Sequence, residues 1–287
     1  MEHADGVKAA RALVARWKKE GQTIGFVPTM GALHEGHLTL VRRAKAENTR
    51  AITSIFVNPT QFGPNEDFTR YPRDLEGDSK KLASAGCDAV FTTTPDEFYG
   101  PGYVTWVTVE KLTAGLCGTS RPTHFRGVTT VCTKLFNVVQ PERIYMGEKD
   151  YQQVTVLRAM VRDLNMPWEI VPCAIVREKD GLAMSSRNMY LSTDERKRAL
   201  ALSRGLAKAR SAYAGGEKIA KRLEAIVAAE VISAEGKLDY ANVVDGDDLS
   251  FLAEANDKSV LAVAAFMGKT RLIDNHVLGR EFVRLAT

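Results

Sequence analysis

The regular alternation of short apolar runs with amphipathic stretches is the feature that most constrains how this chain can fold. Apolar runs recur along the first part of the chain, at 22–28, 51–57, 88–92, 143–147 and 168–176. Apolar residues repeat at helical spacing at 7–19, ahead of these runs, and at 128–139, as Val128, Val131 and Leu135 do. Strands that alternate with helices predict a parallel sheet covered on both faces, so we expect an α/β fold with a doubly wound sheet.

The pattern of the sequence changes after Val176. Charged, alanine-rich stretches at 193–213 and 217–235 predict two helices. Apolar runs follow them and predict strands at 238–245, 260–268 and 270–275. Helices grouped ahead of strands are typical of an α+β arrangement. We therefore expect a larger domain over residues 1–176 and a smaller α+β domain over residues 177–287.

The composition is that of an ordinary globular protein. Hydrophobic residues make up 45% and charged residues 26% of the chain, which excludes a disordered chain. The longest apolar run, Val260–Met267, has eight residues, whereas a membrane-spanning helix needs about 20. The first residues contain no apolar signal segment, so we expect a cytoplasmic protein with no membrane partner.

The cysteines and the net charge limit the kinds of site and ligand that this chain can have. Cys87, Cys117, Cys132 and Cys173 form no CxxC pair, which excludes a zinc ribbon and a thioredoxin-like site. We expect them to be free thiols in a reducing compartment. The net charge of +4 is compatible with an anionic ligand and does not require nucleic acid.

The most informative segment is PTMGALHEGH at 28–37, which joins a predicted strand to a predicted helix. Doubly wound sheets bind ligands at such junctions, and a helix N-terminus offers N–H groups and a positive dipole end to phosphate. Gly36 permits close approach of a ligand, and the imidazoles of His34 and His37 can hydrogen-bond phosphate oxygens. A shared metal site and incidental surface histidines are the alternatives, although HEGH is one residue shorter than the HExxH zinc motif.

Two basic segments have the composition of polyphosphate-binding loops. GLAMSSRN at 181–188 offers two hydroxyls and the guanidinium of Arg187, which can bind two phosphate oxygens at once. A plain interdomain turn is the alternative for this segment. GEKDYQQ at 147–153 follows another predicted strand, and Lys149 can reach phosphates from there. Asp150 can accept a hydrogen bond from a ribose hydroxyl or cap a helix.

Amide side chains follow the strand predicted at 51–57. The segment FVNPTQF at 56–62 places Asn58 and Gln61 in the loop after this strand. Amides both donate and accept hydrogen bonds, so they suit the hydroxyl and carboxylate groups of a small acid. An ordinary turn is the alternative.

The motifs together resemble a known family. HxGH after the first strand and Ser-Ser-Arg after the last strand resemble the HIGH and KMSKS motifs of the nucleotidylyltransferase superfamily. At closer range the chain resembles the pantothenate synthetase (pantoate–β-alanine ligase) family, through PTMGALHEGH, SIFVNPTQF, HFRGV, GEKDYQQ, DGLAMSSRN and RLIDN. Several motifs in the right order are more specific than any one of them. The resemblance implies a Rossmann-like N-terminal domain and a smaller α+β domain that closes over the site.

The resemblance implies an ATP-dependent ligase of pantothenate biosynthesis. ATP and pantoate would give pantoyl adenylate and pyrophosphate, and the amine of β-alanine would then attack the acyl carbon to give pantothenate and AMP. Adenylation supplies the leaving group that a free carboxylate lacks. We therefore expect catalysis to come mainly from positioning and charge stabilisation.

The resemblance also implies roles for particular residues. His34 and His37 would act on the phosphates of ATP, with His37 donating a proton or a hydrogen bond as pyrophosphate leaves. Pantoate would bind to Gln61 and Gln153, and β-alanine would bind near Gln61. The remaining catalytic residues would be Lys149, Ser185, Ser186 and Arg187. The residues around ATP would be Met30, Gly31, Ala32, Leu33, His34, Glu35, Gly36, His37, Gly147, Glu148, Lys149, Asp150, Val176, Met184, Ser185, Ser186 and Arg187.

The resemblance further implies a metal and an assembly. Mg²⁺ would accompany ATP and bridge its phosphate oxygens with few protein ligands. Asp78 is the candidate metal residue, although Gly77 stands where some members of the family have a second acidic residue. A homodimer formed through the N-terminal domain is expected.

Three other functions stay open on the sequence alone. A different adenylating or cytidylylating enzyme would differ in the pocket around Gln61 and Gln153. An RNA-binding protein would use residues 191–224, which hold nine basic and four acidic residues, although such helical faces are usually solvated. A non-catalytic nucleotide sensor would bind ATP without releasing pyrophosphate.

Overall fold

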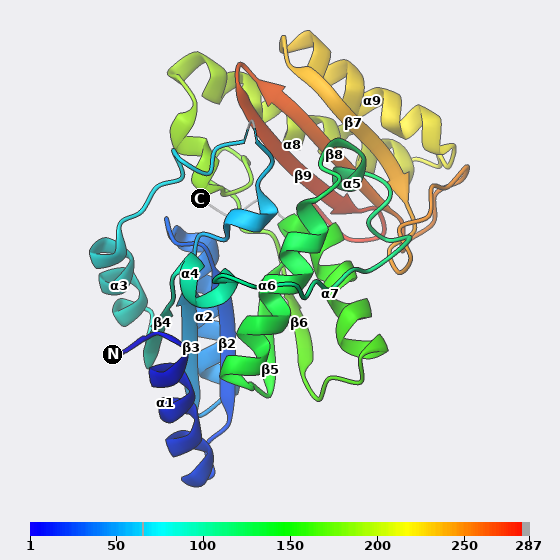
Figure 1. Cartoon of the computed structure of the whole chain (residues 1–287). Helices are drawn as coiled ribbons and strands as arrows, with labels where there is room; N and C mark the ends of the chain where they lie inside the picture. Colours follow the sequence, from blue (N-terminus) through cyan, green and yellow to red (C-terminus); the bar gives the residue numbers. More distant parts are fainter. Residues whose placement is uncertain (65, 283–287) are drawn as a thin grey trace. The chain divides into compact units, whose positions relative to one another are not determined.

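The computed structural model describes residues 1–64 and 66–282 of the chain (Figure 1). These residues form two compact units. Unit 1 comprises the described residues of Met1–Glu110, Arg121–Glu148 and Val156–Ala174. Unit 2 comprises the described residues of Lys111–Ser120, Lys149–Thr155 and Ile175–Thr287. Two short segments that precede Val176 thus belong to unit 2 by their contacts, and the single domain boundary at Val176 stays a prediction.

Unit 1 contains a six-stranded parallel sheet in the order β1-β4-β3-β2-β5-β6. The predicted Rossmann-like, doubly wound sheet is therefore confirmed. Its strands are β1 (Glu2–Asp5), β2 (Ile24–Thr29), β3 (Arg50–Ile55), β4 (Ala89–Thr92), β5 (Arg143–Gly147) and β6 (Glu169–Cys173).

The strand order reverses at β2, and this reversal marks an edge of the sheet suited to ligands. β2 pairs on one side with β3, the next strand in sequence, and on the other side with β5. In this second pairing, Gly25 lies opposite Arg143 and Phe26 lies opposite Ile144. Open α/β sheets bind ligands beyond the carboxyl ends of the strands at such a switch point. The segments that follow Thr29 of β2 and Gly147 of β5 begin at this edge.

The helices of unit 1 bury apolar faces that their sequences predict. In α1, Ala10, Leu13, Val14 and Trp17 are buried, as the helical spacing of these residues indicates. Val41 of α2 belongs to a buried cluster with residues of the sheet. The helices are α1 (Val7–Lys19), α2 (Glu35–Glu47), α3 (Leu75–Ser84), α4 (Pro95–Tyr99), α6 (His124–Val139) and α7 (Tyr151–Asp163), the last of which begins in unit 2.

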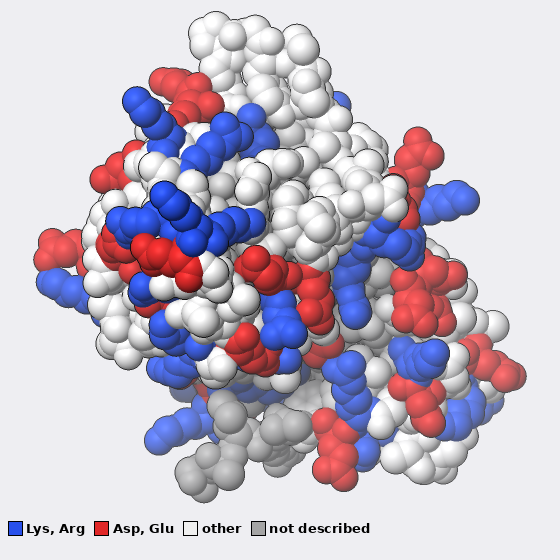
Figure 2. All heavy atoms as spheres, turned by 90° about the horizontal axis from the view of Figure 1, so that it is seen from below, with Lys and Arg blue, Asp and Glu red and all other residues white. Residues whose placement is uncertain are grey.

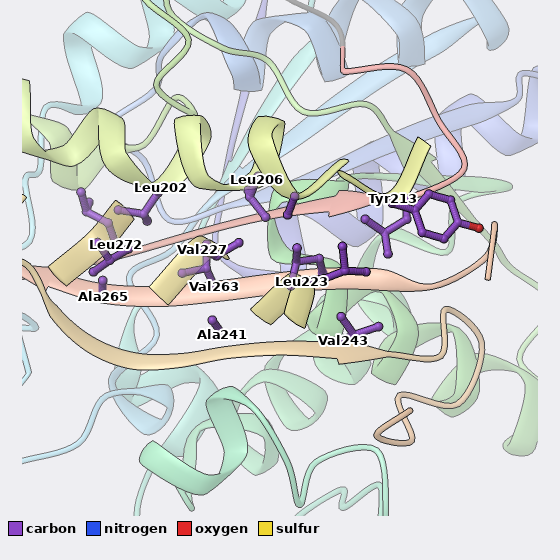
Figure 3. Close-up of a cluster of buried hydrophobic side chains, with 14 of the residues drawn as sticks. Leu202, Leu206, Tyr213, Leu223, Val227, Ala241, Val243, Val263, Ala265 and Leu272 are labelled. Atoms are coloured by element: carbon purple, nitrogen blue, oxygen red, sulfur yellow. The ribbon is translucent and has the colours of Figure 1, made fainter. Parts of the chain in front are cut away.

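Unit 2 combines an antiparallel sheet, in the order β7-β8-β9, with two long helices. Figure 3 shows Leu206 of α8 and Val227 of α9 directed toward Val263 of β8, and all three belong to one buried cluster. The predicted smaller α+β part is thus confirmed. Its elements are α5 (Cys117–Ser120), α8 (Thr193–Ala214), α9 (Ala220–Ser233), β7 (Lys237–Val244), β8 (Val260–Met267) and β9 (Thr270–Val277).

The structure differs from the predicted elements at the start of helix α6, where two segments of the chain lie close together. Helix α6 begins at His124, four residues before the predicted start at Val128. The sequence pattern stops at Gly127, because glycine ordinarily weakens a helix. In the structure this glycine is needed, since a Cβ atom there would lie 2.4 Å from the carbonyl oxygen of Thr60.

Candidate active site

The loop between β2 and α2 has an unusual backbone that short polar contacts hold in place. Gly31 and Ala32 are consecutive residues with positive φ, 84° and 52°. Glycine adopts this region readily, whereas alanine does so at a cost of roughly 1–2 kcal/mol. The hydroxyl of Thr29 donates to the carbonyl of Ser54 at 2.7 Å and accepts from the N–H of Gly31 at 3.2 Å. The loop is therefore joined to the end of β3.

His34 and His37 lie together at the start of α2. His34 is the N-cap residue, and the two ring centroids are 4.1 Å apart. The backbone N–H of His34 donates to Nδ1 of His37 at 3.3 Å. A ring nitrogen that accepts a hydrogen bond carries no proton, so neutral His37 has its proton on Nε2. The loop therefore presents the Nε2–H of His37 as a hydrogen-bond donor.

Glu35 and Gly36 form the first residues of α2 after the N-cap. The carboxylate of Glu35 pairs with Arg42 further along the helix, and this hydrogen bond lowers the pKa of Glu35. Within this predicted ATP-binding segment, the Glu35 side chain is thus engaged by its own helix. The first turn of a helix contributes N–H groups, which suit an anionic ligand.

The amide of Gln61 lies beside the loop that carries the histidines. Its Nε2 lies 3.2 Å from Sδ of Met30, and its Oε1 accepts from Nδ2 of Asn58 at 3.0 Å. Nδ1 of His124 lies 3.0 Å from the backbone carbonyl of Gln61. A residue predicted to bind pantoate and one predicted to bind ATP are therefore neighbours in unit 1.

The buried side chain of Asn58 holds the Gln61 segment in place through hydrogen bonds. It is 1% exposed, its Nδ2 donates to the carbonyl of Gly127 at 3.2 Å, and its Oδ1 accepts from the hydroxyl of Tyr99 at 2.9 Å. Burial raises the pKa of Tyr99, which keeps that hydroxyl protonated as a donor. The motif at 56–62 indicates Asn58 as a residue for a substrate hydroxyl. It gives no sign of Tyr99, which no local motif connects to the 58–61 segment.

Lys149 and Asp150 follow β5 and belong to unit 2. Nζ of Lys149 lies 3.3 Å from Oδ2 of Asp150, and the carbonyl of Lys149 accepts from Nδ2 of Asn275 at 2.8 Å. Asn275 lies in the RLIDN motif on β9. The contact explains how two motifs that are far apart in the sequence support the same candidate residue.

Adjacent glutamines at the start of α7 have different surroundings. Gln152 is buried, and its Nε2 donates to the carbonyls of Leu112 and Gly115, both at 2.9 Å. Its Oε1 accepts from the N–H of Cys117 at 3.0 Å. Gln153, the predicted pantoate residue, is partly exposed. The structural role of Gln152 is not predicted by the sequence pattern, because its partners are about 35–40 residues away.

The 176–188 segment of unit 2 forms a hairpin that ends in the predicted phosphate loop. Met184 donates its N–H to the carbonyl of Val176 at 3.0 Å, and Gly181, with a φ of 97°, occupies the turn. Oγ of Ser185 accepts from the N–H of Arg187 at 3.2 Å and caps a 3-10 helix at Ser186–Tyr190. The predicted residues of this segment are therefore held by local hydrogen bonds.

A buried ion pair anchors the base of that hairpin. Nη1 and Nη2 of Arg177 donate to the carboxylate of Asp274 on β9, at 2.6 and 2.9 Å, and the two side chains are 5% and 2% exposed. Arg177 also donates to the carbonyl of Gly181 at 3.1 Å. The hairpin and β9 are thereby joined within unit 2.

The structure places the predicted residues in two sets. Met30–His37, Gln61, Gly147 and Glu148 belong to unit 1. Lys149, Asp150, Gln153, Val176 and Met184–Arg187 belong to unit 2. Their roles toward ATP, pantoate and β-alanine stay predictions.

Asp78, the predicted metal residue, has protein partners on both oxygens. Its Oδ2 accepts from the N–H of Ala32 at 2.7 Å, and its Oδ1 accepts from the N–H of Leu33 at 2.9 Å. Residues 1–64 and 66–282 contain no group of three or more His, Cys, Asp or Glu side chains that could hold a metal ion. The described residues therefore do not fit a protein-built Mg²⁺ site.

A family model supplies the decisive comparison. The model for pantoate-beta-alanine ligase matches residues 2–277. The chain belongs to the pantoate–β-alanine ligase family. This match extends over both units and confirms the resemblance on which the predicted site rests.

Individual members of the pantoate–β-alanine ligase family are close in sequence and in structure. A pantothenate synthetase of Thermotoga neapolitana is 55% identical over 263 residues, which cover 91% of this chain and 94% of the relative. A pantothenate synthetase of Moorella thermoacetica is 52% identical over 279 residues, covering 97% and 99%. The crystal structure of pantothenate synthetase from Thermus thermophilus matches with a TM-score of 0.92 and 45% identity, covering 97% of this chain and 99% of its own.

A further solved member of the pantoate–β-alanine ligase family carries ligands. The ligase from Francisella tularensis, complexed with beta-gamma ATP and beta-alanine, matches with a TM-score of 0.80 and 34% identity. The match covers 99% of this chain and 100% of that one. In the part of this chain that the structure describes, no helix has both the length and the apolar character needed to cross a bilayer.

Proposed function

We propose that this ligase condenses pantoate with β-alanine in an ATP-dependent reaction that passes through pantoyl adenylate. The observation that carries the proposal is the His34–His37 pair at the start of α2, after the loop that follows β2, where the strand order of the sheet reverses. Gln61 lies against Met30 of the same loop, which supports binding of the acid beside the nucleotide. The family of the chain supports both substrates and the use of ATP.

In the first step, a carboxylate oxygen of pantoate attacks the α-phosphorus of ATP and the bond to pyrophosphate breaks. Negative charge then grows on the departing pyrophosphate. The Nε2–H of His37 is the donor that this charge requires, because the His34 backbone fixes the ring with Nδ1 as an acceptor. Lys149 and Arg187 supply positive charge, and Ser185 and Ser186 supply hydroxyls.

In the second step, the neutral amine of β-alanine attacks the acyl carbon of pantoyl adenylate. The bond to AMP breaks, and the nitrogen loses a proton as the amide forms. Gln61 and Gln153 hold the pantoyl group, with Gln61 also near the amine. Exclusion of water from the site would protect the adenylate, which water otherwise hydrolyses.

Mg²⁺ enters this reaction with ATP. The described residues offer no cluster of ligands for a free ion, and Mg²⁺ is commonly held by substrate phosphates with few protein groups. When bound, it neutralises phosphate charge. The homodimer and the cytoplasmic location that the resemblance implies stay predictions.

An ATP–pyrophosphate exchange assay over a panel of small carboxylic acids tests the proposal. We expect exchange that depends on pantoate and occurs before any amine is added. Exchange with a different acid would indicate another adenylating enzyme of the superfamily. ATP binding without exchange for any acid would indicate a nucleotide sensor.

The charged helices of unit 2 argue against the RNA-binding alternative. Glu230 of α9 pairs with Arg204 and Lys208 of α8, and Arg198 pairs with Glu235. Figure 2, which views the molecule from below, shows basic and acidic side chains beside one another on that other face as well. Paired charges of this kind are typical of a solvated face, and we expect no salt-sensitive retention on RNA.

Replacing Gln153 with alanine is expected to weaken pantoate binding far more than ATP binding. The amide would otherwise hydrogen-bond a pantoate hydroxyl or carboxylate, and leaving such a group unpaired costs about 1–3 kcal/mol. Separate titrations of pantoate and ATP measure the two effects. Thr155→Ala is the matched control, since Thr155 lies on the same helix and donates to the carbonyl of Tyr151. Equal losses for both ligands would place Gln153 in a general structural role.

A further inference from the structure

We propose that Asp78 is a positioning residue that holds the 30–37 loop in its ATP-binding conformation. The proposal rests on the proposed function and deepens it. Asp78 lies in the first turn of α3, yet its carboxylate reaches the loop between β2 and α2. Its two oxygens each accept one backbone N–H of that loop, from Ala32 at 2.7 Å and from Leu33 at 2.9 Å.

The loop conformation requires such a partner. Gly31 and Ala32 have consecutive positive φ angles, and Ala32 adopts this region at a cost. Successive N–H groups in this type of turn form a concave site for an anion. Here the Asp78 carboxylate, which is 1% exposed, occupies that site from within the protein. The carboxylate thus offsets the conformational cost of the positive φ at Ala32. The loop then leads into α2, with His34 and His37 at the start of that helix.

Neighbouring residues restrict Asp78 to this position. A Cβ atom at Gly31 would lie 3.1 Å from Oδ2 of Asp78 and 3.1 Å from Cγ2 of Ile55, so the carboxylate and the loop are in close contact. Nζ of Lys81 donates to the carbonyl of Leu33 at 2.9 Å and lies 3.4 Å from Oδ1 of Asp78. The lysine therefore ties α3 to the same loop through a second contact.

These contacts distinguish a positioning role from a metal-binding role. Both oxygens of Asp78 already accept charge-assisted hydrogen bonds, and the side chain is almost fully buried. The N–H groups of Ala32 and Leu33 are likewise engaged by the carboxylate. We therefore assign phosphate contacts of this loop to the start of α2 and the histidines, with Asp78 acting through the backbone.

The variants Asp78→Asn and Asp78→Ala test the proposal. Asparagine keeps the volume but replaces one acceptor with an amide donor that faces a backbone N–H, and alanine removes both acceptors. We expect ATP affinity, measured by calorimetry with ATP in EDTA and again with excess Mg²⁺, to fall about 10- to 100-fold in both conditions. In the exchange assay, KM for ATP should rise by a similar factor while KM for pantoate changes less than threefold.

Two controls separate this role from general stability. Asp74→Asn changes the N-cap residue of the same helix, whose carboxylate accepts from the N–H of Gly77 within α3. Lys81→Met removes the hydrogen bond from Nζ of Lys81 to the carbonyl of Leu33. Because Lys81 is half-exposed, we expect a smaller fall in ATP affinity than in the Asp78 variants. Thermal melting of each variant shows whether the fold is retained.

Specific outcomes would overturn the proposal. Loss of affinity that appears only with Mg²⁺, or that excess Mg²⁺ restores, would make Asp78 a metal ligand. Equal changes in KM for ATP and pantoate, reproduced by Asp74→Asn, would assign Asp78 to the stability of α3. Calorimetry needs no turnover, so a wild-type chain that binds ATP but shows no exchange would refute the proposed function and leave this inference standing.

Discussion

Replacement of His37 by alanine is expected to slow formation of the acyl adenylate by roughly 10²–10³-fold, the scale for losing one transition-state donor. The reason is the Nε2–H, which the loop presents as a donor because Nδ1 accepts from the backbone of His34. Rapid-quench measurement of pantoyl adenylate in a single turnover gives this rate directly. A rate within threefold of the wild type would contradict the assignment.

Two conservative variants of His37 locate the effect on a single atom. Asparagine can place an acceptor near the position of Nδ1 but has no group near Nε2, so the loop contact is retained while the donor is lost. Glutamine places an N–H donor near the position of Nε2. We expect His37→Asn to be as slow as His37→Ala and His37→Gln to recover part of the rate. The reverse order would show that the His34 contact, rather than the donor, limits adenylation.

Removal of Asp274 is expected to destabilise unit 2 by about 3–5 kcal/mol, because it leaves the buried guanidinium of Arg177 without its carboxylate. Asp274→Ala and Arg177→Met should each lower the urea midpoint of the helical signal in far-ultraviolet circular dichroism. The double variant Arg177→Met with Asp274→Ala should lose less than the sum of these two single variants, because no charge is left buried. Additive losses would show that the pair contributes no coupled stability.

The same ion pair also connects stability with the phosphate loop. Arg177 donates to Gly181 at the turn of the hairpin, and the hairpin leads into Ser185 and Arg187. We expect the double variant to fold and still show faster hydrogen exchange in peptides covering 177–192. Unchanged exchange there would mean that the local hydrogen bonds of the hairpin are sufficient.

Much of the sheet could be predicted from the sequence because its strands are buried on both faces. A continuous apolar run indicates such a strand, because side chains on both faces of the strand are buried. The run at 143–147 coincides with β5. The helices with clear apolar faces, such as α1, were predicted for the same reason. The histidine pair was found because strand end, glycine and helix start are adjacent in the sequence.

The remaining features depend on contacts between distant residues. Strand β1 is only Glu2–Asp5 and has no apolar alternation, and it exists because its backbone pairs with β4. Helix α5 lies in a stretch rich in glycine and threonine, and buried Gln152 holds its first residue. Asp78 could be singled out from the family pattern alone, but its partners, 45 and 46 residues earlier, could not be read from spacing.

The hydrogen bond from the His34 backbone to His37 links the shape of the loop to its proton content. An imidazolium has N–H groups at both ring nitrogens, so a second proton on His37 would abolish the acceptor that the loop uses at Nδ1. The conformation of this loop and the protonation of His37 are therefore thermodynamically coupled. An interaction that favours the neutral ring of His37 also favours the turn that the His34–His37 hydrogen bond closes. Neutral His37 can therefore donate a hydrogen bond from Nε2–H to the departing pyrophosphate and keep its proton, so the turn would keep its shape through the catalytic cycle.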